Sequence, residues 1–249
     1  GGIIPPAMQQ KSTRTDRAGW TEQALWALVA ILVPVCLHVI FRSVPTEEKM
    51  GVVQRIFYFH VPSAFAGFLG VGLCAVFSAL YLWKRERRYD LVAHAAAELS
   101  VVFFTIVLLT GPIWARPVWG VWWPGEVRLT STLVLWLLYA GYLLLRQSAE
   151  NPEQAARWGA VLGIVGALDL PIIYKSVEWW RGMPPKVLKV SGCQGLDPAM
   201  ERALLLCSVT FILLFVLLLI QRCRTGVLED EVDSLTLHLS RRSANTEPA

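Results

Sequence analysis

The stretch PVWGVWWPGEVRLTS, residues 117–131, places aromatic rings next to charged groups. Its candidate binding residues are Trp119, Gly120, Trp122, Trp123, Glu126 and Arg128. Flat indole rings beside a glycine can build a platform for a planar apolar ligand, and a guanidinium can bind a ligand carboxylate through two hydrogen bonds. The alternative is an aromatic belt, because tryptophan gathers where a membrane meets water. A belt accounts for one or two tryptophans, and both interpretations stay open on these residues alone.

A single histidine, His60 in RIFYFHVPSAFAG, is the candidate metal ligand. It precedes Pro62, which suits the first turn of a helix. A histidine at the mouth of a membrane span is often an interfacial hydrogen-bonding residue. Ionisable groups at membrane depth are also functional candidates, and imidazole is a common ligand of haem iron. We interpret His38 and His94 as structural, and we expect Asp169, beside a proline, to make a helix-packing hydrogen bond rather than a ligand contact.

The elements that must position these residues are membrane helices. Of 249 residues, 55% are apolar and 17% are charged, against about 25% charged in an average soluble domain. Several apolar runs approach the roughly 20 residues that a helix needs to cross a bilayer, and only a helix satisfies its own backbone there. The sequence predicts an all-α integral membrane protein with six transmembrane helices, at 21–41, 61–83, 99–115 (preceded by a helical extension), 129–145, 158–174 and 203–220.

The predicted organisation is a polar N-terminal tail at residues 1–19, a six-span membrane domain at 20–222 and a cytoplasmic tail at 223–249. Residues 84–88, KRERR, form the densest basic cluster beside a span and predict cytoplasmic termini. The loops 42–60, 116–128 and 175–202 then face outward. The last of these loops is also basic, which an anionic ligand would explain. In the tail, Leu228, Val232, Leu235 and Leu239 indicate an amphipathic helix for self-packing or a partner, with a solvated helix as the alternative.

Several classes are excluded by motifs that the sequence lacks. None of the five cysteines forms C-x-x-C or C-x-x-C-H, which argues against a thioredoxin-like pair and against covalent haem attachment. No Walker A pattern occurs, so the chain is not a P-loop ATPase. The net charge of +4 is spread over the loops, which argues against nucleic acid as a partner. No cleaved signal peptide is evident.

The segment WGVWWPGEVRLTS resembles the signature W-G-x-x-W-x-W-D-x-R-L-T of the cytochrome c maturation protein C family, in the haem-handling protein superfamily. FYFHVPSAF, TGPIWARPVWG, TSTLVLWLLYAGYLLL and LDLPIIYKSVEWWR also resemble family segments, in the family's order. The resemblance covers roughly residues 20–222. Trp119, Gly120, Trp123, Arg128, Leu129 and Thr130 match the signature, and His60 matches the first of the family's two outward histidines.

The resemblance implies a function without bond-making chemistry, so the protein is not expected to be an enzyme. It implies that haem b is held non-covalently at the outer face of a bacterial inner membrane and presented to a haem chaperone for cytochrome c maturation. A small membrane helper subunit, and possible ABC transporter subunits, are the other implied partners. Two alternatives remain: a permease subunit of an ABC-type exporter that moves haem or another amphipathic substrate, and a structural assembly subunit without ligand.

Three departures from the family pattern bear on the site. Gly125 stands where the signature has tryptophan, and Glu126 stands where it has aspartate. The family's second histidine is absent from WWRGMPPK, where Met183 is the nearest candidate for a second iron ligand. Lys186 and Lys189 follow as candidates, with Arg128, for binding the haem propionates.

Overall fold

The chain folds into long helices that run side by side. The computed structural model describes residues 6–47, 50–179 and 197–244, which form seven α-helices and two short helical turns. The α-helices are α1 (Pro6–His38), α2 (Phe57–Lys84), α3 (Arg87–Trp119), α4 (Val127–Ser148), α5 (Pro152–Ala167), α6 (Asp169–Trp179) and α7 (Pro198–Ala244). A π-helical turn, η1 (Val39–Ser43), follows α1, and a 3-10 turn, η2 (Val52–Ile56), precedes α2. No sheet occurs among the described residues.

Within the part of the chain that the structure describes, six helical segments are long and apolar enough to cross a membrane, which confirms the predicted fold class. They are Gly19–Ser43, Val52–Lys84, Arg87–Pro117, Val127–Ser148, Pro152–Lys175 and Pro198–Thr236. The expected helical extension before the third span is confirmed, because α3 begins at Arg87. The fifth span is interrupted at Leu168, between α5 and α6. Both terminal helices exceed the spans: α1 begins at Pro6, where we expected a loose tail, and α7 continues to Ala244.

Local sequence explains where several helices start and stop. Asn151 caps α5, and its side chain accepts hydrogen bonds from the backbone N–H groups of Glu153 (2.9 Å) and Gln154 (3.3 Å). Pro152 occupies the first helical position, where its missing N–H costs nothing. At its C-terminus, α3 ends at Gly120, which has φ of 77° and adopts the left-handed conformation that commonly follows the last helical turn.

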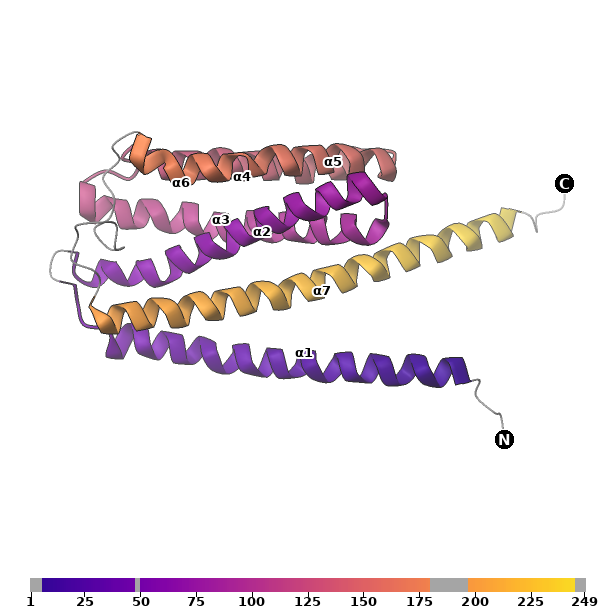
Figure 1. The fold of residues 1–249 in the computed structure, drawn as a ribbon, viewed down its shortest axis with the longest axis horizontal. Coiled ribbons are helices and arrows are strands. Elements are labelled where there is room, and N and C mark those ends of the chain that lie inside the picture. The colour runs from indigo at the N-terminus through magenta and orange to yellow at the C-terminus, as the bar shows by residue number, and fades with distance from the viewer. Residues whose placement is uncertain (1–5, 48–49, 180–196, 245–249) are drawn as a thin grey trace.

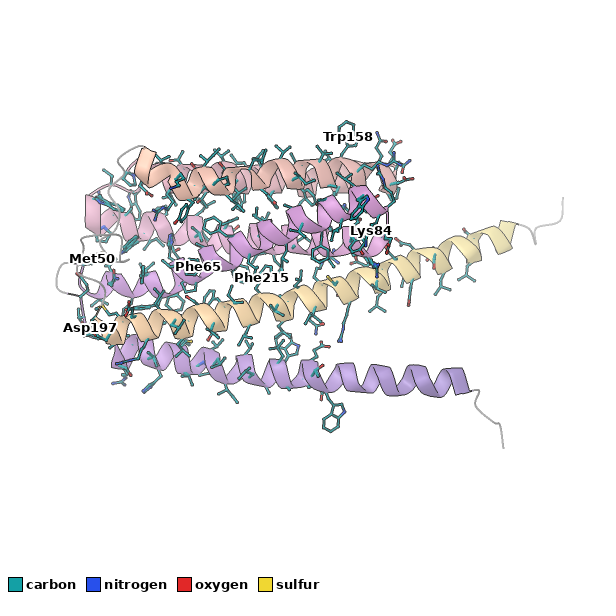
Figure 2. All side chains as sticks on the ribbon, viewed as in Figure 1. Met50, Phe65, Lys84, Trp158, Asp197 and Phe215 are labelled. Atoms are coloured by element: carbon teal, nitrogen blue, oxygen red, sulfur yellow. The ribbon has the colours of Figure 1, made fainter. Side chains whose placement is uncertain are left out.

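The helices form three groups across the bundle (Figure 1). The pair α2 and α3 lies in the middle; α4, α5 and α6 pack on one side of it, and α7 followed by α1 on the other. Both chain termini and the short α2–α3 turn lie at one end of the bundle. Met50, before α2, and Asp197, before α7, lie at the other end, opposite Lys84 and Trp158 (Figure 2), and the connection from α3 to α4 lies at that end too (Figure 1). An even number of spans requires this arrangement of the termini.

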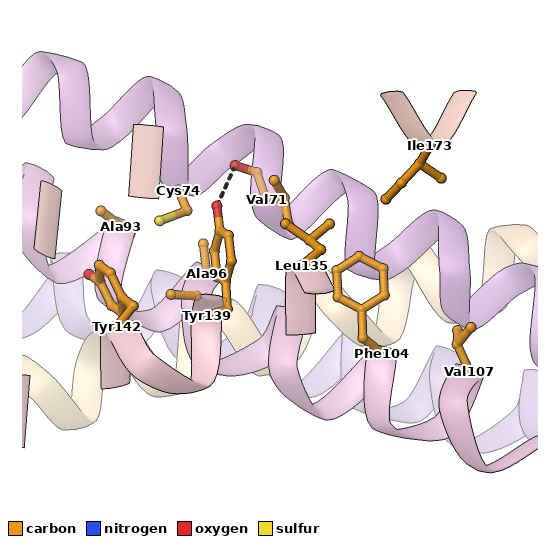
Figure 3. Close-up of a cluster of buried hydrophobic side chains, with 11 residues drawn as sticks. Val71, Cys74, Ala93, Ala96, Phe104, Val107, Leu135, Tyr139, Tyr142 and Ile173 are labelled. Atoms are coloured by element: carbon orange, nitrogen blue, oxygen red, sulfur yellow. Dashed lines mark hydrogen bonds between the residues drawn. The ribbon is translucent and has the colours of Figure 1, made fainter. Parts of the chain in front are cut away.

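The central core interlocks aromatic rings with small residues (Figure 3). Tyr139 of α4 is buried, and its hydroxyl lies 3.1 Å from the carbonyl oxygen of Gly163 in α5. The same hydroxyl lies 3.5 Å from the carbonyl oxygen of Val71 in α2, the contact drawn as a dashed line in Figure 3. A Cβ on Gly166 would lie 2.6 Å from Cε2 of Tyr139, and a Cβ on Gly163 would lie 2.9 Å from Sγ of Cys74. In lipid, helices associate through such close van der Waals contact, because lipid tails are as apolar as the helix surfaces. The glycines of α5 therefore let α4 and α2 approach closely.

Ion pairs join the helices near the end that carries the termini. Buried Asp90 of α3 binds Arg146 of α4 (2.5 and 2.8 Å) and also Arg87. Arg222 of α7 binds Glu98 of α3 (2.5 and 3.1 Å), and Arg224 of α7 pairs with Glu22 of α1. Arg87 lies in α3 itself, so the other three side-chain pairs connect four helices. Asp90 and Glu98 thus lie within the third span, because α3 begins before its apolar run.

Candidate functional site

The predicted site residues gather at the end of the bundle opposite the termini. The 3-10 turn η2 leads into α2 at Phe57, so His60 lies in the first turn of α2, as Pro62 predicted. The last two turns of α3 lie beside it, because α2 and α3 pack along their lengths. The N-terminus of α4 completes the site through Arg128 and Leu129.

His60 is held against α3. Its Nδ1 is 2.9 Å from Oγ1 of Thr110, and its ring centroid is 6.2 Å from that of Trp114. Between these two residues, Gly111 leaves room: a Cβ there would lie 3.5 Å from Cε1 of His60 and 2.9 Å from Cδ1 of Leu129. The imidazole is thus enclosed by the hydroxyl, the glycine surface and an indole.

Trp114 extends the aromatic platform inward. Its ring meets that of Trp119 edge to face, with centroids 5.9 Å apart, and it is only 7% exposed. Its buried indole N–H has no hydrogen-bond partner among the described residues. Buried donors are almost always satisfied, so an unmet indole N–H beside His60 and Trp119 suits a ligand that brings an acceptor.

Thr110, Gly111 and Trp114 were not among the predicted site residues. They lie in TGPIWARPVWG, one of the segments that carried the family resemblance. Thr110 and Trp114 are four residues apart, so they share a helix face. That spacing, with a glycine between them at the end of a predicted span, is the signal by which the sequence could have indicated them.

The loop between α3 and α4 holds the remaining tryptophans at the surface. Trp122 is 59% exposed and Trp123 is 39% exposed, so neither is packed into the core. The guanidinium of Arg116 lies over the Trp122 ring, 5.9 Å from its centroid, and donates to the carbonyl of Gly120. The exposed rings of Trp122 and Trp123 are therefore available to contact a planar ligand or the membrane interface.

Two glycines set the path of this loop. Gly120 has φ of 77° and Gly125 has φ of 68°, and side-chain-bearing residues rarely adopt this region. The departure at Gly125 therefore has a backbone reason, because a tryptophan at this φ would be strained. Gly120, which matches the glycine of the family signature, also has a positive φ, because it ends α3.

Glu126 and Arg128 form the charged edge of the site. Glu126 is half-buried immediately before α4, and its backbone carbonyl accepts from the N–H (3.1 Å) and the hydroxyl (3.0 Å) of Thr130. Burial raises the pKa of the Glu126 carboxyl, although nearby Arg128 and the backbone N–H of Leu129 partly offset the effect. Arg128 precedes Leu129, whose side chain lies against Gly111 beside His60.

The structure thus brings His60, Trp119 and Arg128 together and leaves Trp122 and Trp123 on the surface. Met183, Lys186 and Lys189 lie outside the described residues. Of the residues interpreted as structural, His94 contacts Glu98 (3.3 Å) within α3, and His38 is exposed at the end of α1. Asp169 opens α6, and its buried Oδ2 has no hydrogen-bond partner among the described residues, so this atom does not make the expected packing bond.

These features define a helical membrane protein of six candidate spans with an aromatic, histidine-containing site at one end of the bundle. Residues 7–238 match the family model described as heme exporter protein C (CcmC). The chain therefore belongs to the heme exporter protein C family, as the sequence resemblance indicated. This is a family of membrane proteins and not of enzymes.

Bacterial relatives support the assignment over most of the chain. The heme exporter protein C of Bradyrhizobium diazoefficiens is 37% identical over 202 residues, which are 80% of this chain and 76% of that protein. That of Escherichia coli K12 is 33% identical over 227 residues, covering 90% of this chain and 89% of the relative. That of Paracoccus denitrificans is 35% identical over 185 residues, covering 74% and 77%.

Proposed function

We propose that this protein binds haem b non-covalently at the outer membrane face and presents it to a haem chaperone for cytochrome c maturation. The haem is cargo, and its binding needs no bond-making chemistry in the protein. The main supporting observation is that His60 of α2, Trp114 and Trp119 of α3 and the start of α4 meet at one end of the bundle. Arg128 stands there next to Leu129, which lies against Gly111. Family membership supports haem as the ligand.

The side chains at the site suit the iron of haem, which is already bound by a porphyrin, better than a free metal ion. Among the residues that the structure describes, no three His, Cys, Asp or Glu side chains converge to hold a bare ion. His60 would instead supply one axial ligand to haem iron, whose equatorial ligands belong to the porphyrin. The indole rings offer apolar surface for the macrocycle, and Arg128 and the unmet N–H of Trp114 offer donors to its carboxylates.

The orientation follows from the charge distribution. The basic turn at residues 84–88 lies at the same end as both termini, and the site lies at the opposite end (Figure 1). The positive-inside rule then assigns the termini to the cytoplasm of a bacterial inner membrane and the site to the outer face. An acceptor on that side, assisted by a small membrane helper and by ABC transporter subunits, would take the haem directly from the surface.

The alternative, a permease subunit with a translocation path through the bundle, gains less support. A polar path requires charges that are available within the spans, and Asp90, Glu98 and Glu22 are each paired with an arginine of another helix. Paired charges of this kind join helices. Asp169 keeps one buried oxygen without a partner among the described residues. The absorption spectrum of the purified protein distinguishes a haem-binding protein from this permease and from a structural assembly subunit without ligand.

The test is the haem content of purified protein after haem-replete expression. We expect a Soret band in the wild type, nearly complete loss in His60→Ala and partial recovery when imidazole is added, because the aromatic surface is unaltered. His38→Ala is the matched control, since His38 is an exposed histidine at the same end of the bundle. Met183→Ala should have a smaller effect than His60→Ala. Full haem content with an unaltered spectrum in His60→Ala would exclude the proposed site.

A further inference from the structure

The contact between His60 and Thr110 restricts which ring nitrogen can bind a metal. Oγ1 of Thr110 lies 2.7 Å from the carbonyl oxygen of Ile106, one turn back along α3, and 2.9 Å from Nδ1 of His60. A third, longer contact of 3.3 Å reaches the carbonyl of Val107. A threonine hydroxyl has one proton to donate and lone pairs to accept with.

The proton of Thr110 is required between the two oxygens. At 2.7 Å, a hydroxyl oxygen and the Ile106 carbonyl oxygen would repel each other unless the hydroxyl proton lies between them. The contact with His60 must then be made by a proton on Nδ1, which donates to Oγ1. In neutral imidazole a proton on Nδ1 leaves the lone pair on Nε2, on the far side of the ring from Thr110.

The surroundings of the ring keep this orientation. A ring flip would give up the contact between Nδ1 and Thr110, and Gly111 and Trp114 also lie against the ring. Histidines that bind metals almost always donate their second ring N–H to a neighbouring acceptor, which fixes the tautomer and directs the ligand nitrogen. Thr110 stands where such an acceptor is needed.

We propose that Thr110 is the positioning residue of the haem site: it holds His60 as the Nδ1–H tautomer, so that Nε2 is the atom that ligates iron. This inference rests on the proposed haem function. Thr110 acts through His60 and makes no contact with the ligand itself. The threonine is therefore expected to control affinity and ligand field, while the tryptophans and Arg128 hold the macrocycle and its carboxylates.

The first test uses the protein without haem. NMR of isotopically labelled histidine reports which ring nitrogen of His60 carries the proton, with His60→Ala used to assign the signal. We expect Nδ1–H in the wild type and in Thr110→Ser, which keeps the hydroxyl, and a shift to Nε2–H in Thr110→Val, which keeps the shape but has no acceptor. Thr105→Val is the matched control, because Thr105 makes the same bond to a carbonyl of α3 (Val101, 2.7 Å) but accepts from Trp136 (2.9 Å).

The second test adds haem to the same variants. Loss of an outer acceptor commonly lowers metal affinity by about 10- to 100-fold, so Thr110→Val should bind haem that much more weakly, with a changed low-spin spectrum. Thr110→Ser should restore both properties, and Thr105→Val should leave both unchanged.

The two readouts separate this inference from the proposed function. An Nε2–H tautomer in the wild type, or an unchanged tautomer and affinity in Thr110→Val, would overturn the role of Thr110 while leaving haem binding to be judged by His60→Ala. A Thr110-dependent tautomer in a wild-type protein that takes up no haem would overturn the proposed function, and the haem role of Thr110 with it.

Discussion

Replacing Gly166 by alanine tests whether close contact between α4 and α5 holds the bundle together. The added Cβ would lie 2.6 Å from Cε2 of Tyr139, whereas ordinary van der Waals contact begins at 3.4 Å. Tyr139 cannot turn aside easily, because it is buried and its hydroxyl is bonded to the Gly163 carbonyl. The helices must therefore separate by roughly the missing 0.8 Å, which is the difference between those two distances.

The expected cost follows from two opposing effects. Overpacking of a core costs about 1–3 kcal/mol, and weakening of the Tyr139 hydrogen bond adds about 1 kcal/mol. The higher helix propensity of alanine relative to glycine stabilises the folded state by up to about 1 kcal/mol. We expect Gly166→Ala to lower the free energy of unfolding by about 1–3 kcal/mol.

Gly141→Ala is the matched control, because Gly141 lies in α4 and has no atom within 4 Å of its added Cβ. It should be neutral or slightly stabilising. The measurement is reversible unfolding in mixed micelles with increasing denaturing detergent, followed by far-ultraviolet circular dichroism. If Gly166→Ala proves as stable as Gly141→Ala, the packing of Tyr139 on α5 is not tight and the reasoning fails.

Three further predictions concern the site and its orientation. Replacing Trp119 and Trp123 together by alanine should sharply reduce haem retention, since stacking on an aromatic ring is worth about 1–3 kcal/mol in other systems. Trp158→Ala, at the opposite end of the bundle (Figure 2), should leave haem retention unchanged. Equal haem retention in the two variants would mean that Trp119 and Trp123 are only an interfacial belt. Single cysteines at 85 and 120 should be labelled from opposite sides of the membrane, and labelling from the same side would contradict the six-span arrangement. Because burial raises the pKa of Glu126, the folded protein binds that proton more tightly than the unfolded chain does. Wild-type stability should therefore fall relative to Glu126→Gln as pH rises above about 4.5 through the raised pKa, and parallel stability profiles would contradict the burial of this carboxyl.

Much of the architecture could be predicted because its signals are local. Membrane spans are recorded in consecutive apolar residues, so hydropathy alone predicted six helices, and Pro62 placed His60 at the start of α2. The family could also be predicted, because the signature segment around Trp119 and Arg128 and several other short segments follow one another in the family's order. Helix ends were harder, because α1, α3 and α7 continue through polar residues that hydropathy assigns to loops.

The composition of the site was decided by tertiary structure. Nothing in the sequence near His60 indicates Thr110 or Trp114, which are 50 and 54 positions away and meet it only because α2 packs along α3. The pairing of Asp90 with Arg146, and of Glu98 with Arg222, has the same origin. Periodicity and hydropathy fix which residues are helical, but the rotation and register of one helix against another depend on how distant side chains interlock, such as Tyr139 against the glycines of α5. That interlocking, and not the local sequence, decides that His60 lies against Thr110 and Trp114.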